Sequence, residues 1–530
     1  TTTLLNLGYD GDPIRRKVLF KLHDVNPGDI IQYEYCHTEP LSRSSSGLFY
    51  YHEQDFVLVS NLYITLPLKA KANYYSFPQN IIGDPQITDA SKTYGSGKTY
   101  FWSVTNLNPI PDEPCSFPFS SQSYLTAFVV DKWTINSPVI GNWNDIAEDY
   151  YKYHIKGKKI SNKFFNELNL PTNPDLINKS FGTVDTLYHT LRNIIQLRTY
   201  NSIYPTNEIT NVFKNGYGDA TDLAFIMFKI LEKWGFNPKI VWIRDKREGI
   251  IEQTVPSARW FNRIGVQISI NNEKRLYDFD QCIPKWYKTP WFDKNIDIIV
   301  IDKNCALIED TKTPQSYREN TIKEKYDIRF TESSDEMKQV CRISMTGGFA
   351  DNFRGEYFNT DSFETCTKLE ALAKNTFSEY DSIIWNNFFD THDILIEYQG
   401  LSTTKTQNVQ EFKIFKCNNI LLDNFRNTLY SYNRRTCVNL KFPNRIESVW
   451  HFTAPENFQF DSLTVDQKRI TGPNRSSASF KVESSDTQIS YKVTVNFPEY
   501  VIPVKNYPSL IQFLDNIISI SSQNIILKPT

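Results

Sequence analysis

The chain has few of the features that mark membrane-spanning, metal-binding or nucleic-acid-binding proteins. No apolar run reaches the roughly 18 residues that a membrane-spanning helix needs. The eight cysteines never form a Cys-x-x-Cys pair, which argues against a clustered zinc site. The 58 Lys and Arg are balanced by 60 Asp and Glu, so the composition predicts no basic surface for nucleic acid. We therefore expect no transmembrane helix, no metal, no cofactor and no nucleic-acid partner.

Eight cysteines in 530 residues are too few for a disulfide scaffold, and most are expected to be buried free thiols. The chain begins at Thr1 without a basic segment followed by an apolar one, which indicates a processed exported form or a truncated chain. Aromatic residues are plentiful instead. Thirty Tyr and 36 Phe beside three Met favour β-rich modules, and the length suggests roughly three domains.

The period of the apolar residues changes along the chain and predicts its elements. Alternation up to about residue 132 indicates strands, with apolar positions Ile31, Tyr33, Tyr35, Leu62, Ile64 and Leu66. Helical spacing follows at 142–154, 183–200 and, most clearly, 219–234, where Gly235 and Pro238 end the helix. Strands are then predicted at 239–243, 264–270 and 275–279.

The second half is expected to be mostly β structure. One helical stretch is predicted at 362–387, an alternating strand at 489–497, a short helix at 508–518 and a closing strand at 524–528. The chain is thereby divided into an N-terminal β-sandwich (1–132, short of some upstream residues), an α+β domain (133–310), a β-rich segment with one helix (311–437) and a C-terminal β domain (438–530).

The segment Gly218-Asp-Ala-Thr-Asp-Leu-Ala224 stands where the clearest helix begins. A helix N-terminus offers free N–H groups and a partial positive charge, which lower the pKa of a thiol and bind an oxyanion. A cysteine after Asp219 would be an activated nucleophile, but that residue is Ala220. On its own, the segment is better explained as an ordinary capped helix start, with Gly218 and Asp219 before the first turn.

This segment, the long helix ending in Trp-Gly-Phe and the strand after Asn-Pro together resemble the transglutaminase-like (papain-like) domain, in which Gly-Asp-Cys-x-Asp-x-Ala carries the nucleophile. The flanking modules also resemble known families. Residues 28–35 and 101–114 look like the β domain DUF3857, and residues 504–528 look like its partner DUF3858. The resemblance implies an α+β multidomain protein with a central transglutaminase-like domain between antiparallel β-sandwich domains.

Carried over by position, the family's Cys, His and Asp correspond to Ala220, Arg263 and Asp278, with Asp280 as a less favoured alignment of the acid. An alanine methyl cannot attack a carbonyl, and a guanidinium cannot accept a proton at neutral pH. No histidine lies between residues 190 and 391, and His189 and Cys282 are poor replacements for the base and the nucleophile. The resemblance thus implies a vestigial triad.

Two roles for Arg263 remain open. It could form an ion pair with Asp278 that keeps two strands in register. Alternatively it could hold a ligand carboxylate in an open cleft, with Gly218, Asp219 and Trp260 as the other cleft candidates.

The resemblance implies a non-catalytic scaffold or binding protein of the bacterial cell envelope, periplasmic or associated with the outer membrane, with or without a lipid anchor upstream of Thr1. Its expected partners are envelope proteins, such as the subunits of an outer-membrane complex, and a peptide or glycan ligand. Two alternatives stay open: an active peptidase, amidase or transglutaminase captured as a Cys-to-Ala mutant, and a peptide- or glycan-binding module that uses the old cleft.

Overall fold

The structure is a computed structural model that describes residues 2–6, 16–20, 46–67, 70–90, 97–132, 142–198, 202–249, 251–280, 282–284, 287–303, 305–311, 315–331, 336–358, 360–374, 377, 379–403, 407–409, 411–416, 419–461, 468–522 and 524–530. The chain forms two compact units, Thr1–Ser42 and Arg43–Thr530. In the first unit, β1 (Thr2–Asn6) pairs antiparallel with β2 (Arg16–Phe20). The strand expected around Ile31, Tyr33 and Tyr35 lies outside the described residues.

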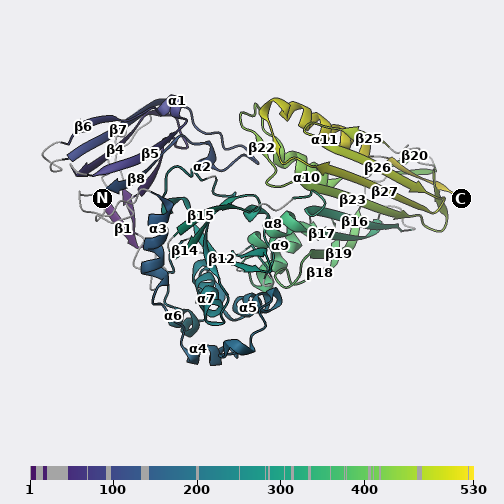
Figure 1. The fold of residues 1–530 in the computed structure, drawn as a ribbon. Helices are drawn as coiled ribbons and strands as arrows, with labels where there is room; N and C mark the ends of the chain where they lie inside the picture. The colour runs from purple at the N-terminus through teal and green to yellow at the C-terminus, as the bar shows by residue number, and fades with distance from the viewer. Residues whose placement is uncertain are drawn as a thin grey trace. The chain divides into compact units, whose positions relative to one another are not determined.

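The second unit begins with a β domain built from two three-stranded antiparallel sheets, β3-β8-β5 and β4-β7-β6 (Figure 1). Its elements are β3 Ser46–Tyr50, β4 Val57–Pro67, β5 Lys71–Phe77, α1 Gln79–Ile82, β6 Gln86–Asp89, β7 Gly97–Leu107, α2 Phe119–Gln122 and β8 Leu125–Lys132. Ile64 and Leu66 of β4 point into the core while Thr65 is exposed, as the alternation predicts. Trp102 of one sheet packs edge-on against Tyr74 of the other, so the two sheets share one core.

The central domain places its helices before its sheet. The helical elements are α3 Trp143–Tyr150, a π-helical turn Tyr151–Ile155, α4 Asn162–Glu167, α5 Phe181–Ile194, α6 Ile209–Asn215 and α7 Ala220–Lys233. Helix α7 begins and ends where the sequence predicts, and Gly235 follows with a positive φ of 74°. It is buried on nearly every side rather than along one stripe, and even Lys229 is enclosed, with its Nζ donating to the carbonyl of Ile155.

A five-stranded antiparallel sheet in the order β13-β12-β11-β14-β15 completes the central domain. Its strands are β11 Lys239–Ile243, β12 Arg263–Ile270, β13 Glu273–Tyr277, β14 Asp297–Asp302 and β15 Cys305–Asp310. The short pair β9 (Gln196–Leu197) and β10 (Tyr217–Gly218) is parallel. Helix α7 lies against this sheet, and both contribute to one hydrophobic core (Figure 1). The predicted order of helices first and antiparallel strands afterwards is confirmed.

The C-terminal region is organised around one eight-stranded sheet in the order β18-β19-β17-β16-β23-β27-β26-β25. Its strands are β16 Thr321–Phe330, β17 Glu336–Met345, β18 Glu379–Trp385, β19 Ile394–Thr403, β23 Asn444–Thr453, β25 Arg469–Thr471, β26 Ser477–Ser484 and β27 Gln488–Phe497. All neighbours are antiparallel except β16 and β23, which run parallel. This pairing joins strands from the two segments expected at 311–437 and 438–530, so one sheet and one core cross that boundary.

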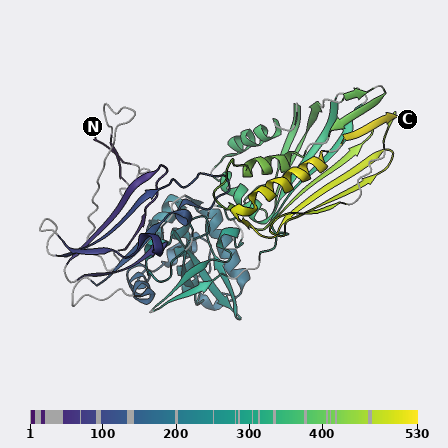
Figure 2. The ribbon, with the colours of Figure 1, turned by 90° about the horizontal axis from the view of Figure 1, so that it is seen from above.

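Helices and a smaller sheet share the core of the eight-stranded sheet. The helices are α8 Gly347–Glu356, α9 Ser362–Lys374, α10 Ile420–Leu429 and α11 Tyr507–Ser521, the last of which lies along the sheet in Figure 2. The smaller sheet has the order β20-β21-β29-β24, from β20 Gln407–Val409, β21 Phe412–Lys416, β24 Phe458–Phe460 and β29 Asn524–Pro529. A further short pair is β22 (Val438–Asn439) with β28 (Val501–Ile502).

The helix expected at 362–387 is wrong in its second half. Helix α9 ends at Lys374, and β18 follows as an edge strand paired with β19. The β-branched and aromatic residues Ile383, Ile384 and Trp385 favour a strand, and the sheet edge accepts them. Sequence periodicity also missed α8, which begins at two glycines that read as a loop.

The six cysteines in the described ranges are free thiols; Cys282 and Cys341 are buried and the other four are half-buried. Most were expected to be buried, so this prediction is wrong for the described residues. Of the helices in the described ranges, none is long and apolar enough to cross a membrane.

Candidate functional site

The N-terminus of α7 is closed by a reciprocal hydrogen-bond pair. The backbone N–H of Asp222 donates to Asp219 Oδ1 at 2.7 Å, and the N–H of Asp219 donates to Asp222 Oδ2 at 3.3 Å. This is a capping box with aspartate at both positions, and it satisfies two N–H groups that a helix start leaves free. Ala220 is the first helical residue, and Gly218 precedes the cap at the end of β10.

The same two aspartates hold the preceding loop against the helix. Asp222 Oδ1 accepts the backbone N–H groups of Thr206 and Asn207 at 2.9 and 3.1 Å. The Thr206 hydroxyl donates to Asp219 Oδ2 at 2.8 Å. The second aspartate of the Gly-Asp-x-x-Asp motif therefore has a structural use in this chain that does not involve Ala220.

Burial and the neighbouring Asp222 raise the pKa of Asp219 from 3.8 to about 7, although hydrogen bonds from Asp222 and Thr206 oppose the rise. Between these two values the folded protein keeps a proton that the unfolded chain has lost, so stability falls as the pH rises. We expect the difference in unfolding free energy between wild type and Asp219→Asn to shrink from pH 4 to pH 7, since asparagine also caps a helix but does not titrate. Urea denaturation across this range measures it, with exposed Asp175→Asn as the baseline; a pH-independent difference would contradict it.

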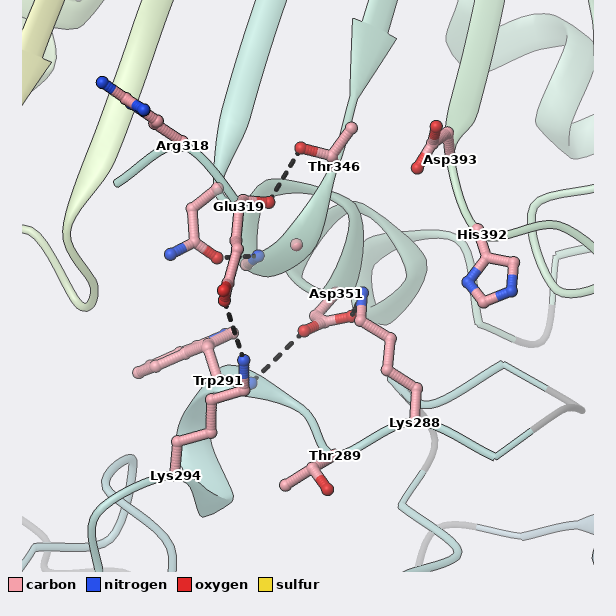
Figure 3. A pocket seen from close by; sticks show the side chains of 13 residues that line it. Lys288, Thr289, Trp291, Lys294, Arg318, Glu319, Thr346, Asp351, His392 and Asp393 are labelled. Atoms are coloured by element: carbon pink, nitrogen blue, oxygen red, sulfur yellow. Dashed lines mark hydrogen bonds and ion pairs between the residues drawn. The ribbon is translucent and has the colours of Figure 1, made fainter. Parts of the chain in front are cut away.

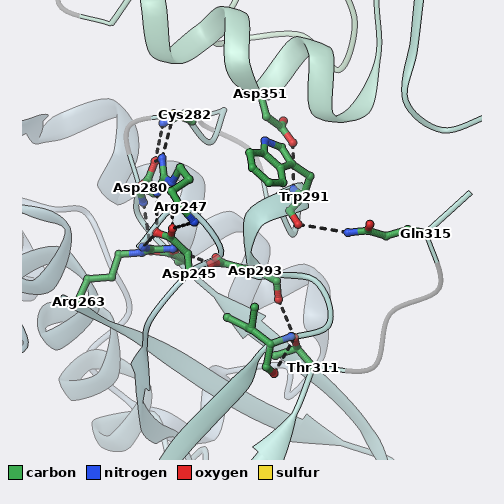
Figure 4. Close-up of polar contacts among 12 residues, drawn as sticks. Asp245, Arg247, Arg263, Asp280, Cys282, Trp291, Asp293, Thr311, Gln315 and Asp351 are labelled. Carbon is green, nitrogen blue, oxygen red and sulfur yellow. Dashed lines mark hydrogen bonds and ion pairs between the residues drawn. The ribbon is translucent and has the colours of Figure 1, made fainter. Parts of the chain in front are cut away.

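Arg263, at the start of β12, is 1% exposed and lies among three carboxylates (Figure 4). Its Nε donates to Asp278 Oδ2 at 2.7 Å, one Nη to Asp293 Oδ1 at 2.6 Å, and the other Nη to Asp245. All three guanidinium nitrogens of Arg263 thus have a carboxylate partner. The predicted Arg263–Asp278 ion pair is confirmed, and two further acids share the same cation.

A second arginine extends this group. Arg247 pairs with Asp245 at 2.8 Å and with Asp280 at 2.6 Å. Burial opposes ionisation of both acids, but the two arginines outweigh it and hold the pKa of Asp245 and of Asp280 below the ordinary value. We call Arg247, Arg263, Asp245, Asp278, Asp280 and Asp293 the buried charge cluster.

Asp293 differs from the other acids of the cluster. Its burial, together with Asp278 and Asp245, raises its pKa well above the usual value despite Arg263. Its Oδ2 has no hydrogen-bond partner among the described residues.

The structure brings the three triad positions together. The backbone N–H of Ile264, beside Arg263, lies 3.4 Å from the Thr221 hydroxyl, beside Ala220. The backbone carbonyl of Asp278 accepts the Tyr188 hydroxyl at 2.9 Å. The start of α7 therefore lies beside the start of β12, and Arg263 of β12 joins Asp278, directly after β13.

The expected cleft is not formed by these residues. Gly218, Asp219, Trp260 and Arg263 are all buried, and the Trp260 indole N–H donates to the carbonyl of Val255 at 3.0 Å. The Nε and both Nη groups of Arg263 already donate to carboxylates of the protein. The second role considered for Arg263, holding a ligand carboxylate, is therefore wrong for this structure.

Neither replacement group is placed for catalysis. Cys282 is buried, and burial together with Asp280 raises the pKa of its thiol above the ordinary value despite Arg247. His189 is exposed on α5, where it contacts Asn193 at 2.9 Å. Among the described residues, no group of three or more His, Cys, Asp and Glu is arranged to hold a metal ion.

Sequence reasoning missed Asp245, Arg247 and Asp293. Asp245 and Arg247 stand in an alternation of basic and acidic residues directly after β11, a signal that could have pointed to them. Asp293 follows Trp291 and Phe292 in a short 3-10 turn, and nothing in that local sequence indicates its distance to Arg263.

The turn that carries Asp293 also contacts the C-terminal region (Figure 4). The backbone N–H of Trp291 donates to Asp351 of α8 at 3.3 Å, and its indole N–H donates to Asn352 at 3.2 Å. The indole ring packs against Phe442 with centroids 5.4 Å apart. One short turn therefore joins the buried charge cluster to α8.

Comparison with known proteins agrees with this fold. Residues 413–527 match the family DUF3858, a domain of unknown function with solved structure. The match begins in β21, before the boundary expected at residue 438. No curated protein matches the chain.

Two solved structures are similar to the chain. One, described as a "putative protease" from Parabacteroides distasonis ATCC 8503, has a TM-score of 0.54 and 11% identity over 93% of this chain and 76% of that chain. The other, described as a "putative cysteine protease" from Cytophaga hutchinsonii, has a TM-score of 0.17 and 8% identity over 44% of this chain and 78% of that chain, which is too low to support an argument. The chain is thus an α+β multidomain protein that shares its fold with the Parabacteroides structure, and its residues 413–527 match the DUF3858 domain.

Proposed function

We propose that the protein is a non-catalytic member of the transglutaminase-like group that acts as a scaffold or binding protein of the bacterial cell envelope. The observation that supports this most is the state of Arg263. It stands where the family has its histidine, it is buried, and three carboxylates occupy its donors.

Thiol acyl transfer needs a nucleophile, a base within hydrogen-bond reach and a group that orients the base. Ala220 supplies no nucleophile, and Arg263 stays protonated because its carboxylate neighbours, opposing burial, raise its pKa further. Asp278, the orienting acid, is used for charge balance instead. Arg263 and Asp278 stabilise the domain through their ion pair.

A Cys-to-Ala mutant of an active enzyme would keep its histidine. The buried charge cluster has four acids that form ion pairs with Arg263 and Arg247. The residues around position 263 therefore suit an arginine there rather than a histidine. This favours natural loss of activity over an engineered trap.

The envelope location and the DUF3857 identity of the first β domain are proposed from the sequence resemblance. They predict that the full-length protein, tagged and purified from its native membranes, brings down a stoichiometric set of envelope proteins identified by mass spectrometry. Recovery of a lone protein would contradict the scaffold role.

Ala220→Cys should not create an acyl transferase. The new thiol would stand at a helix N-terminus, but the position of the family's histidine holds a guanidinium, which cannot accept a proton. We expect no deamidation, cross-linking or cleavage of Gln- and Asn-containing peptides with amines above a no-protein control, for wild type and variant alike, as read by mass spectrometry. Turnover by wild type would refute the proposed function. Turnover only in the double variant Ala220→Cys with Arg263→His would show that the two lost groups alone account for the inactivity.

A further inference from the structure

The charged side chains of the C-terminal region are not spread evenly. At the start of α8, a cavity of about 400 Å³ is lined by three Lys or Arg and three Asp or Glu: Lys288, Lys294, Arg318, Glu319, Asp351 and Asp393 (Figure 3). These charges balance, so the cavity has no excess of one sign. An excess of positive charge is found instead on one face of the eight-stranded sheet.

This sheet has an inner face that packs against helices and an outer face that does not. Inner side chains such as Tyr326 and Trp450 share one hydrophobic core with buried residues of α10 and α11 (Figure 2). Because successive residues of a strand point to opposite faces, their chain neighbours lie on the outer face. The outer side chains of Lys325, Arg342 and Lys492 are 36%, 39% and 39% exposed, so no described helix covers them.

Basic residues dominate the middle of the outer face. On the four central strands β17, β16, β23 and β27, the described side chains at paired outer positions include seven Lys or Arg and two acids. The basic residues, which we call the basic face, are Lys323, Lys325, Arg329, Lys338, Arg342, Arg445 and Lys492, and the acids are Asp327 and Glu447.

The four flanking strands do not extend this excess. On the same face, β26 and β25 add Lys481, Glu483 and Arg469, while β19 and β18 add Glu397 and Glu379. Over all eight strands the described side chains at paired outer positions are therefore nine basic and five acidic. The positive charge is concentrated on the central strands, in a chain whose formal net charge is −2.

The two acids of the central strands are already paired. Asp327 pairs with Lys325 at 3.2 Å and with Arg342 at 2.6 Å. Glu447 pairs with Lys492 at 3.2 Å and with a second basic residue on its own strand. Each acid is thus shared by two cations, and neither is left to balance the rest of the basic face.

The remaining three cations are not compensated. Among the described residues, no ion pair or side-chain hydrogen bond involves Lys323, Arg329 or Lys338. Arg329 and Lys338 are also register partners on β16 and β17, and like charges directly opposite each other destabilise a sheet. An anionic partner would relieve this repulsion, and the excess of cations would attract one.

The composition of the outer face indicates what kind of anion fits. Every Phe, Tyr and Trp on the strands of this sheet belongs to the inner face, and the described apolar side chains on the outer face of the central strands are Val340 and Val449. Protein interfaces depend on aromatic anchors, and single-stranded nucleic acids are bound by aromatic stacking. This face therefore suits a partner that is recognised by its density of negative charge.

We propose that the basic face binds the surface of an anionic lipid bilayer, with its Lys and Arg side chains contacting lipid phosphate groups. Cations spread over four adjacent strands can meet a planar array of headgroups together, and such binding needs no apolar side chain to insert. The proposal goes beyond the proposed function and does not depend on it, because a bilayer can be bound whether or not the protein is catalytic or has protein partners.

Cosedimentation of the full chain with lipid vesicles tests the proposal. We expect binding to phosphatidylcholine vesicles that contain about 30% phosphatidylglycerol, no binding to pure phosphatidylcholine, and loss of binding at about 0.5 M salt. The triple variant Lys323→Gln, Arg329→Gln and Lys338→Gln should bind about 100-fold more weakly, from roughly fivefold for each basic residue near the bilayer. Thermal unfolding should show that it folds, since no described ion pair is removed.

The matched control is the triple variant Lys156→Gln, Lys158→Gln and Lys159→Gln. These lysines are exposed in the central domain, and their replacement changes the net charge by the same amount. The control should keep the wild-type affinity for anionic vesicles, because charges distant from the bilayer are screened by salt.

Absence of binding to anionic vesicles would overturn the proposal. Equal weakening in the two triple variants would also overturn it, because binding would then follow net charge and not the basic face. Duplex DNA and polyglutamate are tested in the same salt. If either bound the basic face while the vesicles did not, the face would belong to a nucleic acid or an acidic protein instead of a bilayer.

Discussion

Arg263→Met should lower the free energy of unfolding by about 3–5 kcal/mol at pH 7, the usual cost of removing one partner from a buried ion pair. Methionine keeps much of the arginine volume but leaves Asp245, Asp278 and Asp293 without their shared cation. The loss should be smaller at pH 4.5, where the acids left without Arg263 can take up protons in the folded state. Urea denaturation followed by tryptophan fluorescence measures both values.

Arg275→Met is the matched control, because Arg275 belongs to the same sheet but makes partly exposed ion pairs with Asp185 and Glu273. It should cost less than about 1 kcal/mol. Adding Asp245→Asn to Arg263→Met should recover part of the loss, since fewer uncompensated carboxylates remain. Equal effects of Arg263→Met and Arg275→Met would contradict a structural role for the buried charge cluster.

Trp291→Ala is expected to destabilise the contact between the central domain and α8 by about 3–5 kcal/mol, the range for a large aromatic side chain removed from a core. The indole is 5% exposed and packs against Phe292 and Phe442 with centroid distances of 5.7 and 5.4 Å. Its removal leaves a cavity and takes the hydrogen-bond donor from Asn352. Thermal unfolding and limited proteolysis should both register the change, with new cleavage between residues 303 and 320.

Phe363→Ala is the comparison for Trp291→Ala, because Phe363 is 81% exposed on α9 and its loss should stay within about 0.5 kcal/mol. If Trp291→Ala lowered stability without any new cleavage in this stretch, the turn would matter for the central core alone and not for the contact with α8.

Helix α7 shows how far sequence reasoning reaches. Asp219 as cap, Gly235 after the last turn and apolar residues at helical spacing are local signals, and the helix has the predicted ends. The pattern predicted one apolar stripe, but α7 is buried on nearly all sides. Period alone cannot show how many neighbours cover a helix, since that depends on elements distant in the chain.

The strands follow the same rule. Alternation located β4 and β27, and local spacing located β11 and β12. Successive residues of a strand point to opposite faces, so a half-buried strand shows alternating apolar and polar residues. No local sequence pattern indicates the parallel pairing of β16 with β23, because it joins residues more than a hundred positions apart. The single C-terminal sheet was therefore beyond the reach of the sequence pattern.

What the sequence determined by itself was which residues, Ala220, Arg263 and Asp278, occupy the positions that the family resemblance assigns to a catalytic triad. The proposed loss of acyl transfer rests on the identity of these residues. The tertiary structure decided what Arg263 does instead. Asp245 and Asp293 reach it from separate segments and pair with it where it is 1% exposed. The sequence shows that residue 263 is an arginine. Its ion-pair partners depend on how segments that are distant in the chain pack together, and these partners compensate its buried charge.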